Sequence, residues 1–250
     1  MVRRFVRGTF VILLLCSGAM LTSEYARAAG GAYVVDNSEI GNPGDCEVDS
    51  WAAFASNHDF NAIASPYCVV KLGVPVQVGA LAQRSRDDGS WGTTASPNLK
   101  INLIPAANHP FGLGVEAFST WDLRSGAYTG STVFVPFTFQ LSDAFTVNVN
   151  GGWLYDGVNK IGYATWGAGF EWIFVKGDQP LTLIGEVFGQ AGNLPIPNDG
   201  GLAPNAIREP RTQLGIRYTP QKNIDLDVIW GHNIAGENAH WLTLGVNVRF

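Results

Sequence analysis

The side chains with the most capacity for chemistry in this chain are charged groups that recur at alternate positions of short apolar segments. Gathered in one interior, carboxylates and guanidinium groups could form salt bridges or line a path for a polar solute. Seven acidic and four basic candidates occupy such positions: Glu47, Asp49, Lys100, Glu116, Glu171, Glu186, Arg211, Arg217, Asp225, Asp227 and Arg249. Because acidic groups predominate, a path lined by them is predicted to prefer cations or neutral polar solutes mildly.

Some of these charges are predicted to pair. A hairpin turning at Gln221 would set Arg217 opposite Asp225, and Arg249 on the next segment could reach Asp225 or Asp227. The charges are therefore consistent with an internal salt-bridge network that plugs and stiffens the interior, and with a ladder that selects solutes. The sequence leaves both hypotheses open.

The cysteine pair Cys46 and Cys68 could form a covalent link. Two short runs, Glu47 to Ser56 and Phe60 to Tyr67, separate these residues and meet at a turn signal near Asn57. If the runs form a hairpin, the two cysteines lie opposite each other, as a disulfide requires. No histidine lies at ligand spacing beside either cysteine, so we expect a disulfide in an oxidising compartment rather than a metal site.

The four histidines do not form a catalytic or metal-binding motif. His58, His232 and His240 fall in or near one set of turns, and His109 falls in another. The chain has no Gly-x-Ser-x-Gly and no His-Glu-x-x-His sequence, and the eight-residue spacing of His232 and His240 is a weak metal signal. We therefore expect no catalytic residue, no metal and no cofactor.

The segments that must position the charges read as β-strands. Each has apolar residues at every second position and is bounded by turn signals. The segments are Glu47–Ser56, Phe60–Tyr67, Val74–Gln83, Trp91–Ile104, Phe111–Asp122, Tyr128–Leu141, Phe145–Tyr155, Ile161–Phe174, Leu181–Gln190, Arg211–Thr219, Ile224–Gly231 and His240–Phe250. A count of about twelve is even, as an antiparallel barrel with both ends on one side requires.

The apolar faces carry bulky Phe, Trp and Val residues, which indicates where they point. A barrel of about twelve strands encloses more space than one row of side chains fills, and a charge at the middle of a lipid-facing surface costs ~2–4 kcal/mol. We therefore predict an all-β fold, a transmembrane antiparallel up-and-down β-barrel of about 12 strands over residues 46–250, with apolar faces outside. A secreted β-sandwich is the soluble alternative.

The first 28 residues predict a secretory signal peptide. Three arginines precede a short apolar run, Val11 to Leu15, and Ala26-Arg27-Ala28 offers small residues for cleavage after Ala28 or Ala29. An uncleaved anchor helix and a lipid anchor at Cys16 are the less favoured alternatives. Residues 29–45 carry Gly, Asn, Asp and Pro without periodicity, and we interpret them as a periplasmic N-terminal segment.

The net charge argues against a nucleic-acid partner. The chain has 16 basic and 21 acidic residues, and removal of residues 1–28 takes away four Arg and one Glu. The remaining 12 basic and 20 acidic residues give a net charge of about −8, whereas nucleic-acid binding needs a basic surface.

Two features resemble known families. The last strand, closing on Phe250, resembles the final strand of bacterial outer-membrane β-barrels, which implies an outer-membrane lipid bilayer and makes Phe250 the signal read by the barrel-insertion machinery. The opening Gly41-x-Pro43-Gly44-x-Cys46-Glu47-x-x-x-Trp51, followed by Pro66-x-Cys68, resembles uncharacterised outer-membrane barrels labelled transporter-like or linked to aromatic-compound pathways. This second resemblance implies passive movement of a small-molecule solute.

The turns are consistent with this topology. Working back from a periplasmic Phe250, the connections on the inner side are all short, and the longest connection, Gly192–Ile207, falls outside, where such barrels keep long loops. A passive channel is our first hypothesis. A closed structural barrel, or one that binds partners through the 192–207 loop, is the second, and an outer-membrane hydrolase is the third.

Overall fold

The computed structural model of the chain describes residues 31–195, 202–235 and 239–250. Twelve strands and one short 3-10 turn, η1 (Ala106–Asn108), follow one another along these residues. The strands are β1 (Cys46–Ala55), β2 (Phe60–Leu72), β3 (Val74–Asp87), β4 (Ser90–Ile104), β5 (Gly112–Asp122), β6 (Tyr128–Ser142), β7 (Phe145–Asp156), β8 (Ile161–Val175), β9 (Leu181–Pro195), β10 (Leu202–Gln221), β11 (Ile224–Asn233) and β12 (His240–Arg249).

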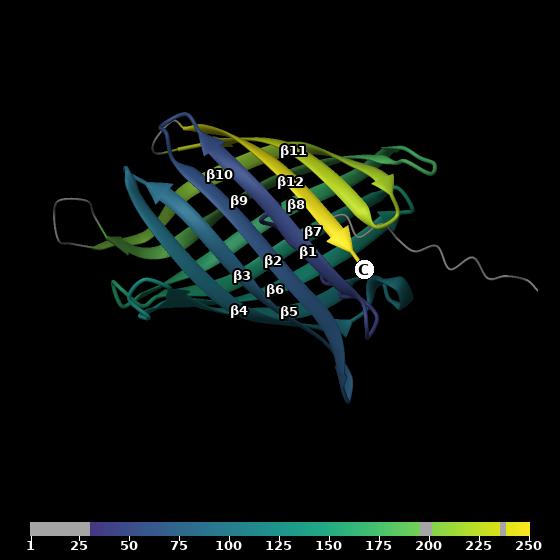
Figure 1. Cartoon of the computed structure of the whole chain (residues 1–250), viewed down its shortest axis with the longest axis horizontal. Coiled ribbons are helices and arrows are strands. Elements are labelled where there is room, and N and C mark those ends of the chain that lie inside the picture. The colour runs from purple at the N-terminus through teal and green to yellow at the C-terminus, as the bar shows by residue number, and fades with distance from the viewer. Residues whose placement is uncertain (1–30, 196–201, 236–238) are drawn as a thin grey trace, which may run out of the picture.

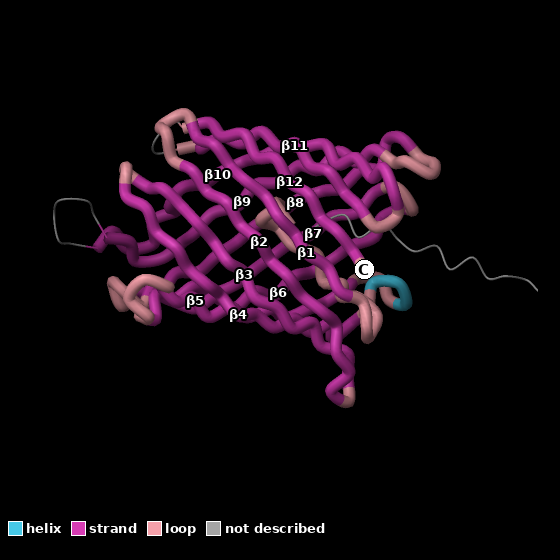
Figure 2. The backbone as a smooth tube through the Cα atoms, viewed as in Figure 1, coloured by secondary structure: helices cyan, strands magenta, loops and turns pink. Residues whose placement is uncertain are grey.

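The strands form a closed antiparallel barrel, in which each strand pairs with its neighbours in the sequence (Figures 1 and 2). Strands β1 and β12 pair from Glu47↔Arg249 to Ala55↔Trp241, which closes the sheet. The prediction of a transmembrane up-and-down barrel of about twelve strands is confirmed. Among the residues that the structure describes, no helix is long and apolar enough to cross a membrane.

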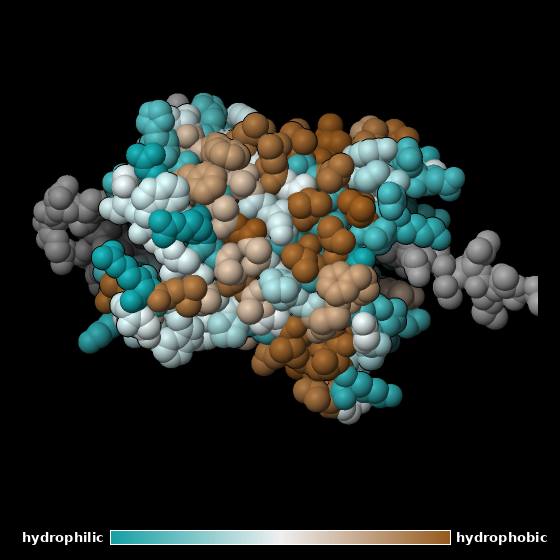
Figure 3. Space-filling model, viewed as in Figure 1, coloured by the Kyte–Doolittle hydropathy of each residue, from teal (hydrophilic) through white to brown (hydrophobic). Residues whose placement is uncertain are grey.

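Burial alternates along the strands with the polarity that a lipid surrounding requires. In β11, Asp225 and Asp227 are 3% and 2% exposed, whereas Leu226 and Val228 are 42% and 55% exposed. Polar residues therefore face the interior and apolar residues face outward, the reverse of a soluble protein. Figure 3 shows apolar side chains gathered on the visible outer surface and hydrophilic ones toward the two ends.

Tight turns connect the strands at one end of the barrel. Gly73 alone links β2 to β3 with a φ of 81°, in the left-handed region that glycine adopts at little cost. Between β6 and β7, only residues 143 and 144 lie outside the strands. Both turns lie where the sequence predicts short connections.

The predicted loop Gly192–Ile207 is shorter in the structure. Strand β9 runs to Pro195 and β10 begins at Leu202, and pairs such as Ala206↔Gly192 continue the ladder between them. The sequence does not predict this extension of the strands, because main-chain pairing needs no apolar periodicity. The Gly, Pro and Asn residues of this segment are also typical of loops. Residues 196–201, the rest of the predicted loop, lie outside the described residues.

Candidate functional site in the barrel lumen

The structure places the predicted charged residues on the inner face of the barrel. Nine of the eleven are buried, with exposures of 8% or less. Arg211 and Arg249 are half-buried. Because most outward neighbours of these residues in the strands are apolar and are less buried than the charged residues, the lumen concentrates the charge of the barrel wall.

Two arginines hold carboxylates near the end of the barrel that carries the chain terminus. Arg217 binds Asp227 through two hydrogen bonds, Nε to Oδ1 at 2.7 Å and Nη2 to Oδ2 at 3.0 Å. The predicted position of Asp225 opposite Arg217 is wrong, because the hairpin turns at Lys222–Asn223 and sets Asp227 opposite Arg217. Arg249 binds Asp225 at 2.6 Å, within the reach that the sequence predicts.

Amide and hydroxyl groups bind other carboxylates of the lumen. The Asn148 amide donates to Glu171 Oε1 at 2.6 Å and accepts from Thr138 Oγ1 at 2.9 Å. The Gln213 amide donates to Glu186 Oε1 at 3.0 Å. Buried polar groups are normally hydrogen-bonded, and these bonds join neighbouring strands into a fixed inner surface.

Residues 32–39, which we call the strap, lie inside the barrel, visible as the pink trace within the ring of strands in Figure 2. Asp36 forms an ion pair with Lys100 of β4. The main-chain N–H of Ser38 donates to Thr138 Oγ1 of β6 at 2.8 Å, and that of Val35 donates to Glu186 of β9 at 2.6 Å. The strap therefore binds the wall from β4 to β9.

The amino-terminal part of the strap packs against the next part of the wall. The Arg217 guanidinium lies 5.3 Å from the centroid of the Tyr33 ring, a cation–π contact. Tyr33 also packs in a small buried cluster with Ala32, Ile184 and Ile229. This cluster adds apolar contacts to the polar anchors of the strap.

Residues 29–45, which the sequence predicts to be a periplasmic segment, have another position in the structure. Within the described part, residues 31–45, the strap occupies the lumen and the remainder leads to the rim, where Gly44 N–H donates to the Val69 carbonyl. Residues 29 and 30 lie outside the described residues. The sequence does not reveal the strap, because a segment held largely through its main chain needs no apolar periodicity.

The predicted disulfide anchors the strap at the rim. Cys46 and Cys68 are bonded to each other and are directly paired between β1 and β2. Phe250 lies beside them, since its main chain exchanges hydrogen bonds of 2.9 and 3.0 Å with Cys46. The two ends of the barrel sequence and the base of the strap therefore meet at one point.

Glycines on the inner face make room for the strap. A Cβ atom at Gly114 would lie 3.0 Å from the Ser38 carbonyl oxygen, and one at Gly167 would lie 2.7 Å from Val35 Cγ2. Six inward glycines follow the strap across the wall: Gly112, Gly114, Gly167, Gly169, Gly215 and Gly245. We call them the glycine track. Glycine within a strand often marks close approach of another backbone, so these glycines are a signal that the alternation of apolar residues alone does not use.

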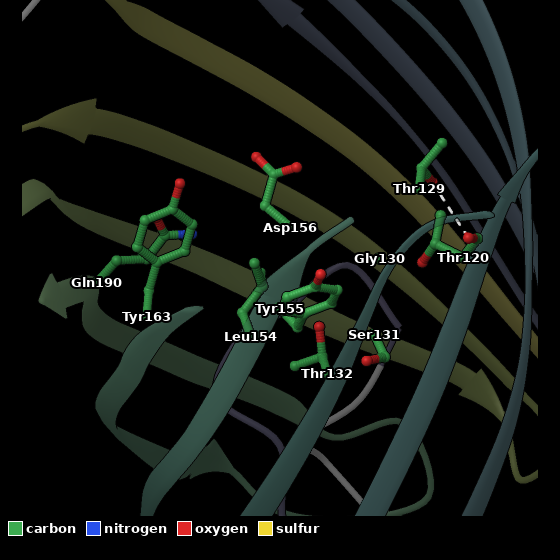
Figure 4. Close-up of a pocket in the computed structure, with 10 residues that line it drawn as sticks. All are labelled: Thr120, Thr129, Gly130, Ser131, Thr132, Leu154, Tyr155, Asp156, Tyr163 and Gln190. Carbon is green, nitrogen blue, oxygen red and sulfur yellow. Dashed lines mark hydrogen bonds between the residues drawn. The ribbon is translucent and has the colours of Figure 1, made fainter. Parts of the chain in front are cut away.

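One cavity lies beside the strap, and a second adjoins it. One of about 250 Å³ is bounded by Val34 and Val35 of the strap and by wall residues that include Phe134, Phe188 and Arg211. The other, of about 400 Å³, is lined mainly by hydroxyl and amide side chains of β5 to β9 (Figure 4). They share Leu154 and Gln190 in their linings, so an apolar surface on the strap continues into a polar one.

Two of the four histidines, His232 and His240, stack on each other and on Trp230. The rings of His232 and His240 are 4.5 Å apart, and each stacks on Trp230 with centroids 6.0 and 5.6 Å away. Among the described residues, no three His, Cys, Asp or Glu side chains are grouped closely enough to hold a metal ion.

A family model described as "Uncharacterised conserved protein UCP029691" matches residues 18–250 of the chain. No curated protein matches it significantly.

Solved structures of porin-like barrels resemble this one. A KdgM porin has a TM-score of 0.58 at 11% identity, covering 82% of this chain and 99% of that chain, and a KdgM porin is also solved in complex with disordered oligogalacturonate. The NanC porin has a TM-score of 0.57 at 7% identity, covering 80% and 98% of the two chains. The COG4313 outer membrane channel from Pseudomonas putida F1 has a TM-score of 0.53 at 14% identity, covering 86% and 98%. At these identities the likeness concerns the fold.

Proposed function

Because this chain belongs to the family described as "Uncharacterised conserved protein UCP029691" and closes into a barrel around charged residues, we propose that it is a passive channel for small solutes in the bacterial outer membrane. The observation that carries this proposal is the polar lumen inside an apolar outer surface. Charges buried in this way are costly unless they are paired or in contact with water or a polar solute. The similar fold of a porin that binds oligogalacturonate supports a route for polar solutes.

The lumen charges support a mild preference for cations or neutral solutes. Seven of the eleven wall charges named above are acidic, and Asp36 of the strap adds another next to Lys100. A narrow passage with excess carboxylates attracts cations and repels anions.

The link to aromatic-compound pathways belongs to the same proposal. The cavity beside the strap places Phe134 and Phe188 near Val34 and Val35, a lining that favours an apolar ring over a small ion. An aromatic solute would then rest on the strap before it passes.

The maturation of the protein follows from the same proposal. Residues 1–28 are removed as a signal peptide during export, and residues 46–250 insert as the barrel. The insertion machinery reads the terminal Phe250, whose side chain is 75% exposed.

A closed structural or surface-binding barrel is the alternative, and the dense bonding of the strap favours it. Lys100, Thr138 and Glu186 all hold strap atoms, so a strap that never moves would leave little free cross-section. The two functions differ in whether solutes pass.

Conductance in planar lipid bilayers tests the proposal. We expect small unitary currents from the full chain and currents at least several-fold larger from a variant lacking residues 31–40, which include the strap. Heat-dependent gel mobility and circular dichroism would establish that the variant is a folded barrel. A folded variant without conductance would reject the channel in favour of the closed barrel.

A further inference from the structure

We propose that the lumen recognises the main chain of short peptides, and that such peptides are solutes of this barrel, with the strap as a resident occupant of their site. The inference rests on the proposed channel function and names the class of solute.

The first support is the set of groups that the wall presents to the strap. Glu186 accepts hydrogen bonds from two successive main-chain N–H groups, those of Val34 at 3.0 Å and Val35 at 2.6 Å. Thr138 accepts the N–H of Ser38 at 2.8 Å. Hydrogen bonds to a carboxylate are among the stronger ones in proteins, and main-chain N–H groups are present in every peptide except at proline.

Asn150 recognises a peptide unit in a second way. The side-chain amide of Asn150 is oriented so that both of its polar atoms have a partner. Its oxygen accepts from the N–H of Asp36 and its nitrogen donates to the Asp36 carbonyl oxygen, both at 2.8 Å. A side-chain amide that forms hydrogen bonds with both main-chain groups of one residue recognises the peptide backbone, whatever side chain that residue carries.

The glycine track supplies the space that such recognition needs. At Gly114, the atom closest to an added Cβ is the main-chain oxygen of Ser38 at 3.0 Å. Because the wall has no side chain at this position, the main chain of the strap lies directly on the strand.

The chemistry of the wall also indicates which peptides fit. Glu47 and Asp49 lie on β1, which pairs with β12, and the Asn247 side chain of β12 lies against Gly31 at the start of the strap. Both carboxylates are buried, with exposures of 8% and 6%. Arg249 compensates part of this charge, at 3.5 Å from Glu47, and the remaining excess of carboxylates favours peptides with a free amino group or a basic side chain at this side of the lumen.

The inference is tested by adding peptides to the variant lacking residues 31–40, the strap-deleted barrel, and measuring how far each peptide reduces the current. The probes are a synthetic peptide of residues 31–39, Gly-Ala-Tyr-Val-Val-Asp-Asn-Ser-Glu, a scrambled peptide of the same composition, and the first peptide N-methylated at the residue equivalent to Val35. We expect the strap and scrambled peptides to reduce current at concentrations within about tenfold of each other. We expect the N-methylated peptide to reach the same block only at a concentration about tenfold higher, because it lacks one N–H donor to Glu186.

A matched variant assigns the effect to the wall. Glu186→Gln in the strap-deleted barrel should weaken block by the strap and scrambled peptides about tenfold, and should weaken block by the N-methylated peptide less. A neutral oligosaccharide of similar length serves as the non-peptide probe and should block poorly.

The outcomes separate this inference from the proposed function. Three results in a conducting barrel would overturn peptide recognition and leave the channel function intact. They are no block by any peptide, block by the strap peptide but not by the scrambled peptide, and equal block by the oligosaccharide. If the folded barrel does not conduct, the channel fails, and binding of fluorescent peptides in detergent still decides recognition by the same comparisons. If deletion of residues 31–40 prevents folding, the binding measurement uses the full chain with Tyr33→Ala and Asp36→Ala, because these changes weaken two contacts that hold the strap. Absence of peptide binding to that variant would overturn the inference.

Discussion

At the scale of single residues, the lumen shows how charge is kept inside a membrane barrel. Arg217 and Asp227 are each 2% exposed and meet through two hydrogen bonds. Removing one partner of such a pair leaves a buried charge without compensation, which costs more than the pair itself contributes. The pairing therefore matters for folding whether or not solutes pass.

The first prediction concerns this pair. Asp227→Ala should lower the free energy of unfolding by about 3–5 kcal/mol, because Arg217 stays buried beside an empty position. Urea unfolding in lipid vesicles measures the change. Asp143→Ala, at an exposed turn, is the matched control and should change stability by less than about 0.5 kcal/mol. An equal loss in both variants would contradict the role assigned to the pair.

The second prediction concerns the glycine track. Gly167→Val should displace the strap, because even the Cβ atom would lie 2.7 Å from Val35 Cγ2, and the single-channel current should rise several-fold. Gly151→Val on neighbouring β7 is the control, since a Cβ atom there meets no atom within 4 Å. Unchanged current in a folded Gly167 variant would show that the strap does not obstruct the lumen.

At the scale of elements, the β1–β2 hairpin joins three functions of the fold. It closes the barrel by pairing with β12, it carries the disulfide between Cys46 and Cys68, and its first residue is joined to the strap by residues 40–45. A single element thus holds the sheet together and fixes where the strap enters. Its loss would affect stability and the lumen at the same time.

The third prediction concerns the disulfide. Replacing Cys46 and Cys68 together by Ser should lower the free energy of unfolding by about 3 kcal/mol, the value for closing a loop of this size in the unfolded chain, given a separation of 22 residues. Urea midpoints with and without a reducing agent measure it. The reductant should affect the natural sequence and leave the double variant unchanged; an effect on both would point to another cause.

The fourth prediction concerns the last residue. Deleting Phe250 removes the main-chain bonds to Cys46 and the proposed insertion signal, so the amount of barrel in the outer membrane should fall several-fold. Phe174→Ser is the control, because this Phe is also outward and 41% exposed but lies within the chain. Fractionation and immunoblotting compare them, and equal amounts in the membrane would refute the signal.

At the scale of the whole molecule, the balance of charge inside the barrel sets what it attracts. The lumen carries more carboxylates than cations, and the strap brings Asp36 to Lys100, one of the few basic groups of the wall. Interactions between such groups weaken as salt screens them. Selectivity should therefore be a property of the complete lumen and should depend on ionic strength.

The fifth prediction concerns this selectivity. Under a tenfold gradient of potassium chloride, the strap-deleted barrel should show a reversal potential of the sign for cation preference. Glu47→Gln combined with Asp49→Asn should reduce that potential, because two buried carboxylates are removed from β1. A reversal potential that indicates anion preference would contradict the proposed electrostatics.

The sequence by itself determined the architecture and the two faces of the wall. Alternation in strands such as Ile224–Asn233 is a local property, since side chains of successive residues point to opposite faces. Bulky apolar residues on one face and charges on the other then leave lipid outside and polar groups inside as the favourable arrangement. The hairpin of Cys46 and Cys68 is local in the same sense, because its turn lies between them.

Only the tertiary structure decided what fills the lumen and which charges meet. The contact of Val35 with Glu186 joins residues 151 positions apart, and it is made through the main chain of Val35, so the residue type at position 35 does not predict it. The pairing of Arg217 with Asp227 instead of Asp225 depended on a turn placed one residue later and an irregular ladder. Such contacts follow from the closure of the barrel, because closure brings distant strands and the strap into a common interior.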